Sequence, residues 1–261
     1  MERADGVLQM KEAAEGRLTR EIEAVSRDEG VPADVVRAGV AAGRIAIVAN
    51  RAGRHRPLGI GAGLRTKVNA NIGTSPDSSD LEGELAKLDA AVDAGADAVM
   101  DLSTGGDIDE IRRAVVERSP VCVGTVPIYQ AAIRARDRGD GMVRMSGDDM
   151  LRAVEDHLRD GVDFVTVHAG VTREVAERCR RSHRLADVVS RGGSIHMEWM
   201  SYNDSENPFY ERYDDLLDVA AEHDATISLG DGLRPGALAD ANDVPQIAEL
   251  TVIAELVKRA R

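Results

Sequence analysis

Two glycine-rich segments contain residue types that bind an anionic group. They are Ser190-Arg191-Gly192-Gly193-Ser194 and Asp231-Gly232-Leu233-Arg234-Pro235-Gly236. Glycine permits close approach of the backbone, serine offers a hydroxyl, and arginine offers a forked cation that fits phosphate. Each segment alone is equally well explained as a tight turn with a solvated arginine. Two such segments after successive apolar runs favour a site for an anion such as phosphate.

Three further polar residues follow or end apolar runs. His168 closes the run before Ala169-Gly170, Asp101 closes another, and Tyr129 ends a third. A histidine in such a place is often a hydrogen-bonded core residue, but the carboxyl end of a strand raises the expectation of a functional role. Asp101 is equally explained as a capping or ion-paired carboxylate, and Tyr129 as a packed ring with a satisfied hydroxyl.

The cysteines and histidines do not form a familiar metal motif. Cys122 and Cys179 make no C-x-x-C pair, and the 6 histidines show no H-x-x-x-H spacing. We therefore expect no metal or iron–sulfur site formed by this chain alone. The glycine-rich run Gly59–Gly63 precedes a strand instead of joining a strand to a helix, so we expect a tight loop there and no dinucleotide site.

The elements that must position these residues alternate between apolar runs and helical patterns. Residues 1–58 read as an N-terminal extension, helical at first, with a β-like run at Arg44–Ala49. The strands that we predict after it are Val68–Ile72, Ala96–Leu102, Val121–Tyr129, Phe164–His168, Val188–Arg191 and Thr226–Leu229. The predicted helices are Asp80–Ala94, Asp107–Arg118, Ser146–Arg159, Thr172–Arg181, Asn207–Glu222 and Asp243–Ala260.

This alternation predicts an α/β fold with a parallel sheet. A (β/α)8 barrel of the TIM type and an open doubly wound sheet both satisfy it. Polar residues at the end of nearly every predicted strand favour the barrel, because a barrel gathers all strand ends around one mouth. Residues 59–261 supply about six strand–helix units, whereas a barrel needs eight. We therefore expect an incomplete barrel: either the chain is a fragment, or something else supplies the remaining units.

Composition narrows the class of partner and the compartment. The chain has 261 residues and a formal net charge of −13, which argues against nucleic acid as a partner. No apolar stretch is long enough to span a bilayer, and the charged N-terminus shows no signal-peptide pattern. These features predict a cytoplasmic protein with no membrane partner.

Six segments together resemble phosphomethylpyrimidine synthases, the ThiC family of thiamine biosynthesis. They occur in that family's order, and the resemblance spans about 51–257. The segments are Lys67–Gly73, Val99–Gly105, Gly124–Gln130, the His168 segment, Ser190–Ser194 and Leu229–Gly236.

The resemblance implies a barrel enzyme of the radical S-adenosylmethionine type, a carbon–carbon lyase. Such an enzyme converts aminoimidazole ribotide to hydroxymethylpyrimidine phosphate through a radical made at a [4Fe–4S] cluster. Carried over motif by motif, it implies that these residues bind the substrate: Asn71, Met100, Tyr129, His168, Ser190, Arg191, Gly192, Asp231, Gly232, Leu233 and Arg234. Which residues are catalytic stays unknown at this point.

The implied contacts divide between the two ends of the ribotide. Ser190, Arg191, Gly192 and Arg234 would hold the phosphate group, while hydrogen bonds to the imidazole and ribose would come from Asn71, Tyr129, His168 and Asp231. Rigid positioning suits radical chemistry, in which one hydrogen atom and no other must be abstracted.

Several of the family's cofactor ligands do not occur in this sequence. The family continues with a Glu-Gly-Pro-Gly-His motif and a later histidine that bind zinc, and with a C-x2-C-x4-C motif that holds the cluster. None of these occurs up to Arg261. We therefore expect this chain alone neither to form the radical nor to bind the zinc.

Three functional hypotheses remain open. The first is a truncated or split phosphomethylpyrimidine synthase, completed by another chain or present as a homodimer. The second is an inactive relative that only binds a phosphorylated ribotide. The third is another phosphosugar enzyme such as an aldolase, which ranks last because Lys67, the only strand lysine, lies at the start of its strand.

Overall fold

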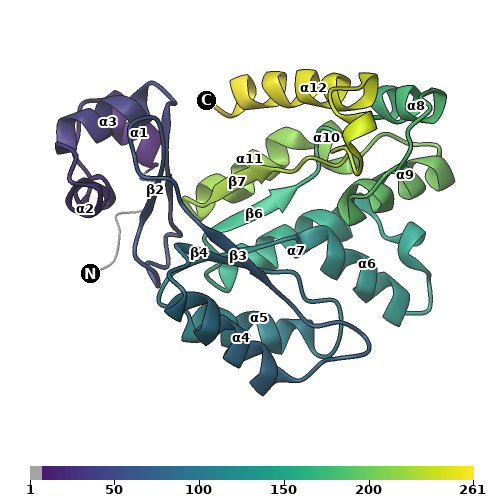
Figure 1. Cartoon of the computed structure of the whole chain (residues 1–261), viewed down its shortest axis with the longest axis horizontal. Helices are drawn as coiled ribbons and strands as arrows, with labels where there is room; N and C mark the ends of the chain where they lie inside the picture. The colour runs from purple at the N-terminus through teal and green to yellow at the C-terminus, as the bar shows by residue number, and fades with distance from the viewer. Residues whose placement is uncertain (1–7) are drawn as a thin grey trace. The chain divides into compact units, whose positions relative to one another are not determined.

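The computed structural model describes residues 8–261 (Figure 1). These residues form two compact units. The first unit comprises residues 8–125, 155–165 and 219–227, and the second comprises residues 126–154, 166–218 and 228–261. The strands β6 and β7 begin in the first unit and end in the second.

The strands are short, and most belong to one parallel sheet. A two-stranded sheet joins β1 and β2, and the five-stranded sheet has the order β3-β4-β5-β6-β7. Their bounds are β1 Ile45–Val48, β2 Leu58–Gly61, β3 Asn69–Ile72, β4 Ala98–Asp101, β5 Cys122–Thr125, β6 Phe164–Val167 and β7 Thr226–Leu229.

Most of the helices follow the strands along the chain. The first unit contains α1 Gln9–Ala14, α2 Arg20–Glu29, α3 Ala33–Ala41, α4 Leu81–Asp93 and α5 Ile108–Arg118. The helices α7 Gly147–Arg159 and α11 Tyr213–Glu222 run from the second unit into the first. The second unit also contains α6 Pro127–Asp137, η1 Met142–Arg144, α8 Arg173–Arg181, α9 Arg191–Asn203, α10 Pro208–Glu211, η2 Leu238–Asp240 and α12 Val244–Ala260.

The sequential strand order confirms the predicted α/β fold with a parallel sheet. The pairs β3–β4, β4–β5 and β5–β6 are parallel, and β7 continues the sheet through Thr226 N to Asp163 O and Gly230 N to Val167 O. A doubly wound sheet reverses its order at a switch point, whereas neighbours in a barrel follow the chain. Five sequential strands do not close a barrel of eight, so the barrel remains a prediction.

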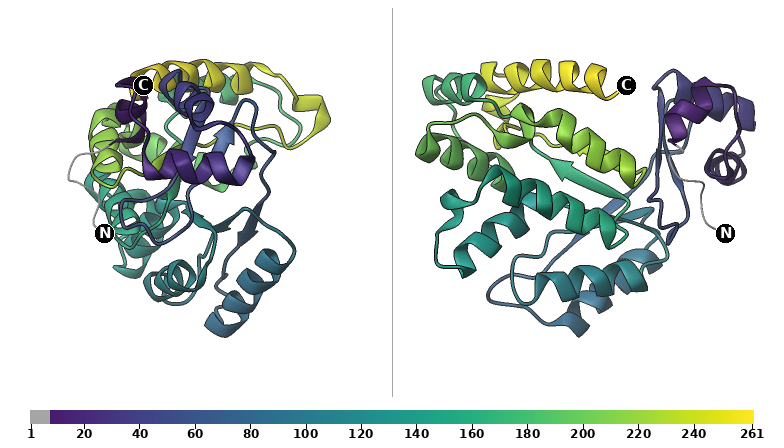
Figure 2. Two further views of the ribbon diagram at one scale, coloured as in Figure 1. Left: turned by 90° about the vertical axis from the view of Figure 1, so that its left-hand side faces the viewer. Right: turned by 180° about the vertical axis from the view of Figure 1, so that it is seen from behind.

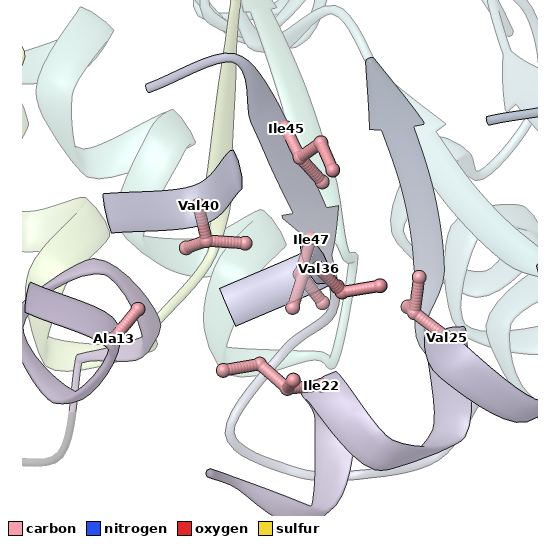
Figure 3. Packing of buried hydrophobic residues seen from close by; sticks show 7 residues of the cluster. All are labelled: Ala13, Ile22, Val25, Val36, Val40, Ile45 and Ile47. Atoms are coloured by element: carbon pink, nitrogen blue, oxygen red, sulfur yellow. The ribbon is translucent and has the colours of Figure 1, made fainter. Parts of the chain in front are cut away.

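In the first unit, α2 and α3 pack on the β1–β2 hairpin, and α1 packs on α3. Thr19 caps α2 by accepting from Ile22 N, and Gly30 ends that helix in the left-handed conformation at φ 65°. Figures 2 and 3 show α1–α3 against the hairpin and the apolar side chains between them. The buried cluster consists of Ala13, Ile22, Val25, Val36, Val40, Ile45 and Ile47. The boundary that we predict at residue 58 coincides with the start of β2, and it stays a prediction.

Most predicted elements are confirmed, and several of the predicted N-caps are present. Asp107 accepts from Glu110 N at the start of α5, Thr172 accepts from Val175 N at the start of α8, and Ser146 Oγ accepts from Asp149 N before α7. These side chains satisfy amides that have no acceptor inside the helix.

Three local predictions were wrong. Val188–Arg191 is not a strand, because Ser190 caps α9 and Arg191 is its first residue. Tyr129 does not end a strand: β5 stops at Thr125 and Pro127 starts α6. Gly59–Gly63 is not simply a loop, since β2 runs through Gly61 and pairs with β1. In the first two cases a helix begins within or directly after an apolar run that resembles a strand.

Within residues 8–261, we find no helix that combines the length and the apolar composition needed to cross a membrane.

Candidate functional site

The N-terminus of α9 forms the centre of the candidate site. Ser190 is 1% exposed, and its Oγ accepts from Gly193 N at 3.2 Å, which fixes the first turn. The first-turn N–H groups of a helix have no intrahelical acceptor, and the helix dipole places partial positive charge there. A Cβ on Gly193 would lie 2.8 Å from Gly232 C and nearer still to the Gly232 oxygen. Glycine therefore lets the helix start touch the next loop.

Arg191 lies over the ring of Tyr129, both within the second unit. The guanidinium carbon of Arg191 is 5.0 Å from the ring centroid, a cation–π distance. The Tyr129 ring is half-buried, and burial raises the pKa of its hydroxyl although Arg191 and Arg234 act in the opposite direction. The stacked ring restrains the exposed guanidinium beside the helix N-terminus, so that the cation and the first-turn amides can act on one anion.

His168 lies directly after β6 and beside the same helix start. The residue is 4% exposed, and its Nε2 lies 3.4 Å from Ser190 Oγ. A Cβ on Gly192 would lie 2.7 Å from that nitrogen and closer to the other ring atoms. Burial lowers the pKa of His168 to about 4, with Asp231 opposing the shift and Arg234 adding to it. The imidazole is therefore neutral at pH 7.

The loop after β7 is held from two sides inside the second unit. Glu249 of α12 accepts from Gly232 N at 2.7 Å and from Leu233 N at 2.8 Å. Arg184 donates to Leu233 O and pairs with Asp243 at 2.6 Å. Both amides of the loop are therefore engaged by the protein itself, and the loop backbone is rigid.

The outward side chains of this loop keep their polar groups exposed. The side chains of Asp231 and Arg234 are 62% and 45% exposed, and Arg234 Nη1 lies 3.2 Å from Asp231 Oδ1. A surface pair of this kind contributes little stability and can reorganise around a ligand. Leu233 is fully buried against Val175 and Cys179, which anchors the loop.

The remaining predicted residues, Asn71 and Met100, lie together in the first unit. They are register partners on the neighbouring strands β3 and β4. Asn71 is exposed and its Oδ1 accepts from Asn69 Nδ2 at 2.9 Å, while Met100 is partly buried. The second unit contains the other nine predicted residues, which are Tyr129, His168, Ser190, Arg191, Gly192, Asp231, Gly232, Leu233 and Arg234.

Sequence reasoning missed two residues that support the site. Asn207 Nδ2 donates at 2.9 Å to the carbonyls of both His168 and Val171, and so fixes the turn after β6. Glu249 is 1% exposed and shares a helix face with buried Pro245 and Leu256. In the sequence, Pro245, Glu249 and Leu256 follow an i, i+4, i+11 spacing. This spacing places the carboxylate on an apolar helix face and was a usable signal that it is buried. For Asn207 the only sequence signal was its position directly before Pro208.

Glu249→Gln is expected to flatten the pH dependence of stability. Burial raises the pKa of Glu249 to about 7, although the Leu233 and Gly232 amides oppose the shift. A raised carboxyl pKa contributes stability that is fully present below about 4.5 and is lost as pH rises through about 7. The wild-type free energy of unfolding should therefore fall by about 1–3 kcal/mol between pH 5 and 8 from this group. Urea unfolding at both pH values measures it.

The matched control is Glu255→Gln on the same helix, where the side chain is 64% exposed. In Glu255→Gln, the free energy of unfolding should fall between pH 5 and 8 by the same amount as in the wild type. If the free energy of unfolding of Glu249→Gln also falls by the wild-type amount between pH 5 and 8, the raised pKa of Glu249 is contradicted.

A model of the radical SAM ThiC family matches residues 8–261. The chain belongs to this family. The family resemblance drawn from the sequence motifs is thereby confirmed.

Curated members of the radical SAM ThiC family are similar along nearly the whole chain. Identity is 57% over 255 residues with the phosphomethylpyrimidine synthase of Moorella thermoacetica, and 55% over 254 residues with that of Desulforudis audaxviator. It is 52% over 254 residues with that of Desulforamulus reducens. Each alignment covers 97% of this chain and 59% of the relative, so the chain spans about 59% of their length.

The radical SAM ThiC family name implies S-adenosylmethionine and an iron–sulfur cluster, and the residues here do not fit a cluster. Across residues 8–261 there is no group of three or more His, Cys, Asp or Glu that could hold a metal ion. Cys122 is 1% and Cys179 4% exposed, in different units, and burial raises the pKa of both thiols. Cluster ligands are thiolates, and a three-cysteine motif needs one thiol more.

Proposed function

We propose that this chain forms the ribotide-binding part of a phosphomethylpyrimidine synthase. In this proposal the complete enzyme, a lyase of thiamine biosynthesis, converts aminoimidazole ribotide to hydroxymethylpyrimidine phosphate with S-adenosylmethionine. The supporting observation is the capped N-terminus of α9, which carries Arg191 stacked on Tyr129 and touches the Gly232 loop. The similarity to phosphomethylpyrimidine synthases supports the choice of reaction.

The phosphate group would lie at the N-terminus of α9. First-turn amides and the helix dipole favour an anion there, as in many phosphate sites. Arg191 and Arg234 would add forked cations, while Ser190 and Gly192 shape the turn that admits the phosphate. A dianionic phosphate would also suit the net positive charge of these two exposed arginines.

The heterocycle and ribose would be held by the remaining groups. In the second unit, Tyr129, His168 and Asp231 offer a hydroxyl, a neutral imidazole and an exposed carboxylate. Gly232 and Leu233 would contribute the rigid loop backbone that aims Asp231. Asn71 and Met100, paired across β3 and β4 in the first unit, are proposed as substrate-binding residues on the family resemblance alone.

The chemical work proposed for these residues is binding and orientation. A radical abstracts whichever hydrogen atom is nearest, so a rigid pocket decides the outcome. No residue is assigned a proton-transfer or covalent role. We also propose that the sequential sheet is part of a (β/α)8 barrel over residues 59–261, with residues 1–58 as an extension. The remaining units would come from a complementing C-terminal chain, and a homodimer would bury part of the exposed sheet edge.

A second candidate function is ribotide binding without catalysis. The observation that favours it is that nine of the residues proposed to bind the ribotide belong to the second unit, whereas residues 8–261 contain no group of three or more His, Cys, Asp or Glu that could hold a metal ion. The two candidates separate on reconstitution with a C-terminal ThiC segment under anaerobic conditions with iron and sulfide. Formation of 5′-deoxyadenosine and hydroxymethylpyrimidine phosphate would support the enzyme, and ribotide binding with neither product would support the binding protein.

Arg191→Ala and Arg234→Ala are expected to weaken aminoimidazole ribotide binding about 10- to 100-fold each. Each substitution removes a charge-assisted contact, which contributes ~1.5–3 kcal/mol. Isothermal titration calorimetry on this chain measures the change. Arg180→Ala is the matched control, because its side chain is 46% exposed and pairs with Glu177 on α8. Equal affinities for all four proteins would contradict the phosphate assignment.

A further inference from the structure

Asp240 is a buried carboxylate that holds the backbone of a distant segment of the second unit. It ends η2, in the chain that follows Arg234, and is 4% exposed. Its Oδ1 accepts from Leu185 N at 2.8 Å, and its Oδ2 accepts from Ala186 N at 3.0 Å. Hydrogen bonds from backbone amides to a carboxylate belong to the stronger, charge-assisted kind. The turn at 185–186 is therefore fastened to η2.

Arg184 ties the same turn to two further segments. Its side chain is 2% exposed, and its Nε and Nη2 form a fork on the Asp243 carboxylate at 2.6 and 2.9 Å. Nη2 also donates to Leu233 O, and Nη1 donates to Asp187 O at 3.3 Å. Asp243 in turn caps α12 by accepting from Gln246 N at 3.0 Å. One planar guanidinium thus joins the turn, the loop after β7 and the start of α12.

The same two segments also meet through apolar atoms. A Cβ on Gly236 would lie 2.8 Å from Ala186 Cβ and nearer still to Val189 Cγ1. A glycine is needed for so close an approach. The chain two residues after Arg234 therefore lies against the chain that leads into Ser190.

The joined segments carry the two cations of the candidate phosphate site. Arg191 follows the cap residue Ser190 at the start of α9, and Arg234 lies shortly before Gly236. Burial raises the pKa of the Tyr129 hydroxyl, and the charges of Arg191 and Arg234 both oppose that shift. Both cations therefore lie near one ring. Two forked cations can act together on one phosphate only when their spacing suits it.

We propose that Asp240 and Arg184 are positioning residues for the phosphate group of the ligand. They join the turn before Ser190 to the chain after Arg234 and so fix the spacing between the two halves of the site before a ligand binds. Such preorganisation adds affinity, because less of the site has to be ordered on binding. This role rests on the proposed function, whereas the coupling between the two segments exists without a ligand.

Amide hydrogen exchange of this chain without ligand tests the coupling. Asp240→Asn keeps the size of the side chain but turns an NH2 group towards one of the two amides. Exchange should become at least about tenfold faster at Leu185 and Ala186, and also faster at Gly193, whose amide donates to the cap residue of α9. Leu238→Ala is the matched control, because this side chain is 96% exposed on the same η2 turn. A wild-type exchange rate at Gly193 in Asp240→Asn would overturn the coupling.

Ligand affinity tests the positioning role. Aminoimidazole ribotide should bind about tenfold more weakly to Asp240→Asn, while its dephosphorylated riboside should bind within about twofold of the wild type. Arg184→Lys should give the same pattern, because lysine keeps the charge but not the fork. A purely structural role would lower the melting temperature and leave both affinities unchanged, and that result would overturn the proposal.

A measurement on the wild-type protein needs no variant to fold. Because coupling is reciprocal, bound ribotide should slow amide exchange at Leu185 and Ala186 several-fold. Unchanged exchange at saturating ribotide would overturn the positioning role. If the wild type does not bind the ribotide, the proposed function fails and the positioning role falls with it. If the ribotide binds equally tightly to the wild type and to Asp240→Asn, the positioning role fails alone.

Discussion

Gly193→Ala is expected to lower the affinity for a phosphorylated ligand about 100-fold, as if about two hydrogen bonds to a charged group were lost. A Cβ at this position would lie 2.8 Å from Gly232 C and nearer to the Gly232 oxygen, which is backbone and cannot rotate away. The α9 N-terminus and the loop before Arg234 must then move apart. Glu249 and Arg184 hold that loop, so the helix start has to shift.

The measurement is calorimetric titration with aminoimidazole ribotide, accompanied by circular dichroism to confirm folding. Ser194→Ala is the matched control, because this neighbouring residue is exposed and the substitution removes atoms instead of adding them. Near-normal affinity in a folded Gly193→Ala protein would show that the contact between these two segments does not form the site.

His55→Asn is expected to lower the free energy of unfolding by about 3–5 kcal/mol, the cost of breaking a buried ion pair. His55 Nδ1 lies 2.6 Å from Asp163 Oδ2, and both side chains are 1% exposed. His55 Nε2 lies 2.9 Å from Val116 O, and Val123 N donates to Asp163 at 2.8 Å. The substitution leaves the Asp163 carboxylate buried without its cation in the first unit.

Thermal unfolding should show the loss as a drop in melting temperature of roughly 10 °C for a chain of this size. His183→Asn changes an exposed histidine and should leave the melting temperature within about 2 °C. Equal stability of the two variants would mean that the pair contributes nothing to the fold.

The His55–Asp163 pair also predicts how the stability of the protein changes with pH. Burial opposes the charged imidazolium of His55, but the hydrogen bond and charge of Asp163 outweigh it, so the pKa of His55 is raised from 6.5. Its contribution is fully present below about pH 6.5 and is lost as pH rises through the raised value. The stability difference between wild type and His55→Asn should therefore be larger at pH 6 than at pH 9.

The regular strands and helices were predictable because their signals are local. The runs at Phe164–Val167 and Thr226–Leu229 are apolar and bounded by polar residues, and capping residues such as Asp107 and Thr172 mark helix starts. The sequential order of the parallel strands also followed from simple alternation with helices. Motif residues from Ser190 to Arg234 were found because glycine, serine and arginine recur after such runs.

The parts that escaped prediction depend on what precedes or packs against a motif. Val188 and Val189 look like a strand, but Ser190 is an N-cap whose side chain meets Gly193 N, and the cap decides the structure. Pro127 likewise starts a helix inside an apolar run. The helical spacing of Glu249 could have marked it as a buried carboxylate, but its contact with the loop after β7 arises from tertiary packing, which no local pattern contains.

The most direct test of the central claim compares aminoimidazole ribotide with its dephosphorylated riboside by calorimetry on this chain. The ribotide is expected to bind at least about 100-fold more tightly, because in the proposed site its phosphate would lie at the α9 N-terminus beside Arg191 and Arg234. Arg191→Ala should reduce the difference in affinity between the ribotide and the riboside. Equal affinity for both compounds, or no binding of the ribotide to well-folded protein, would contradict a phosphate site at this helix.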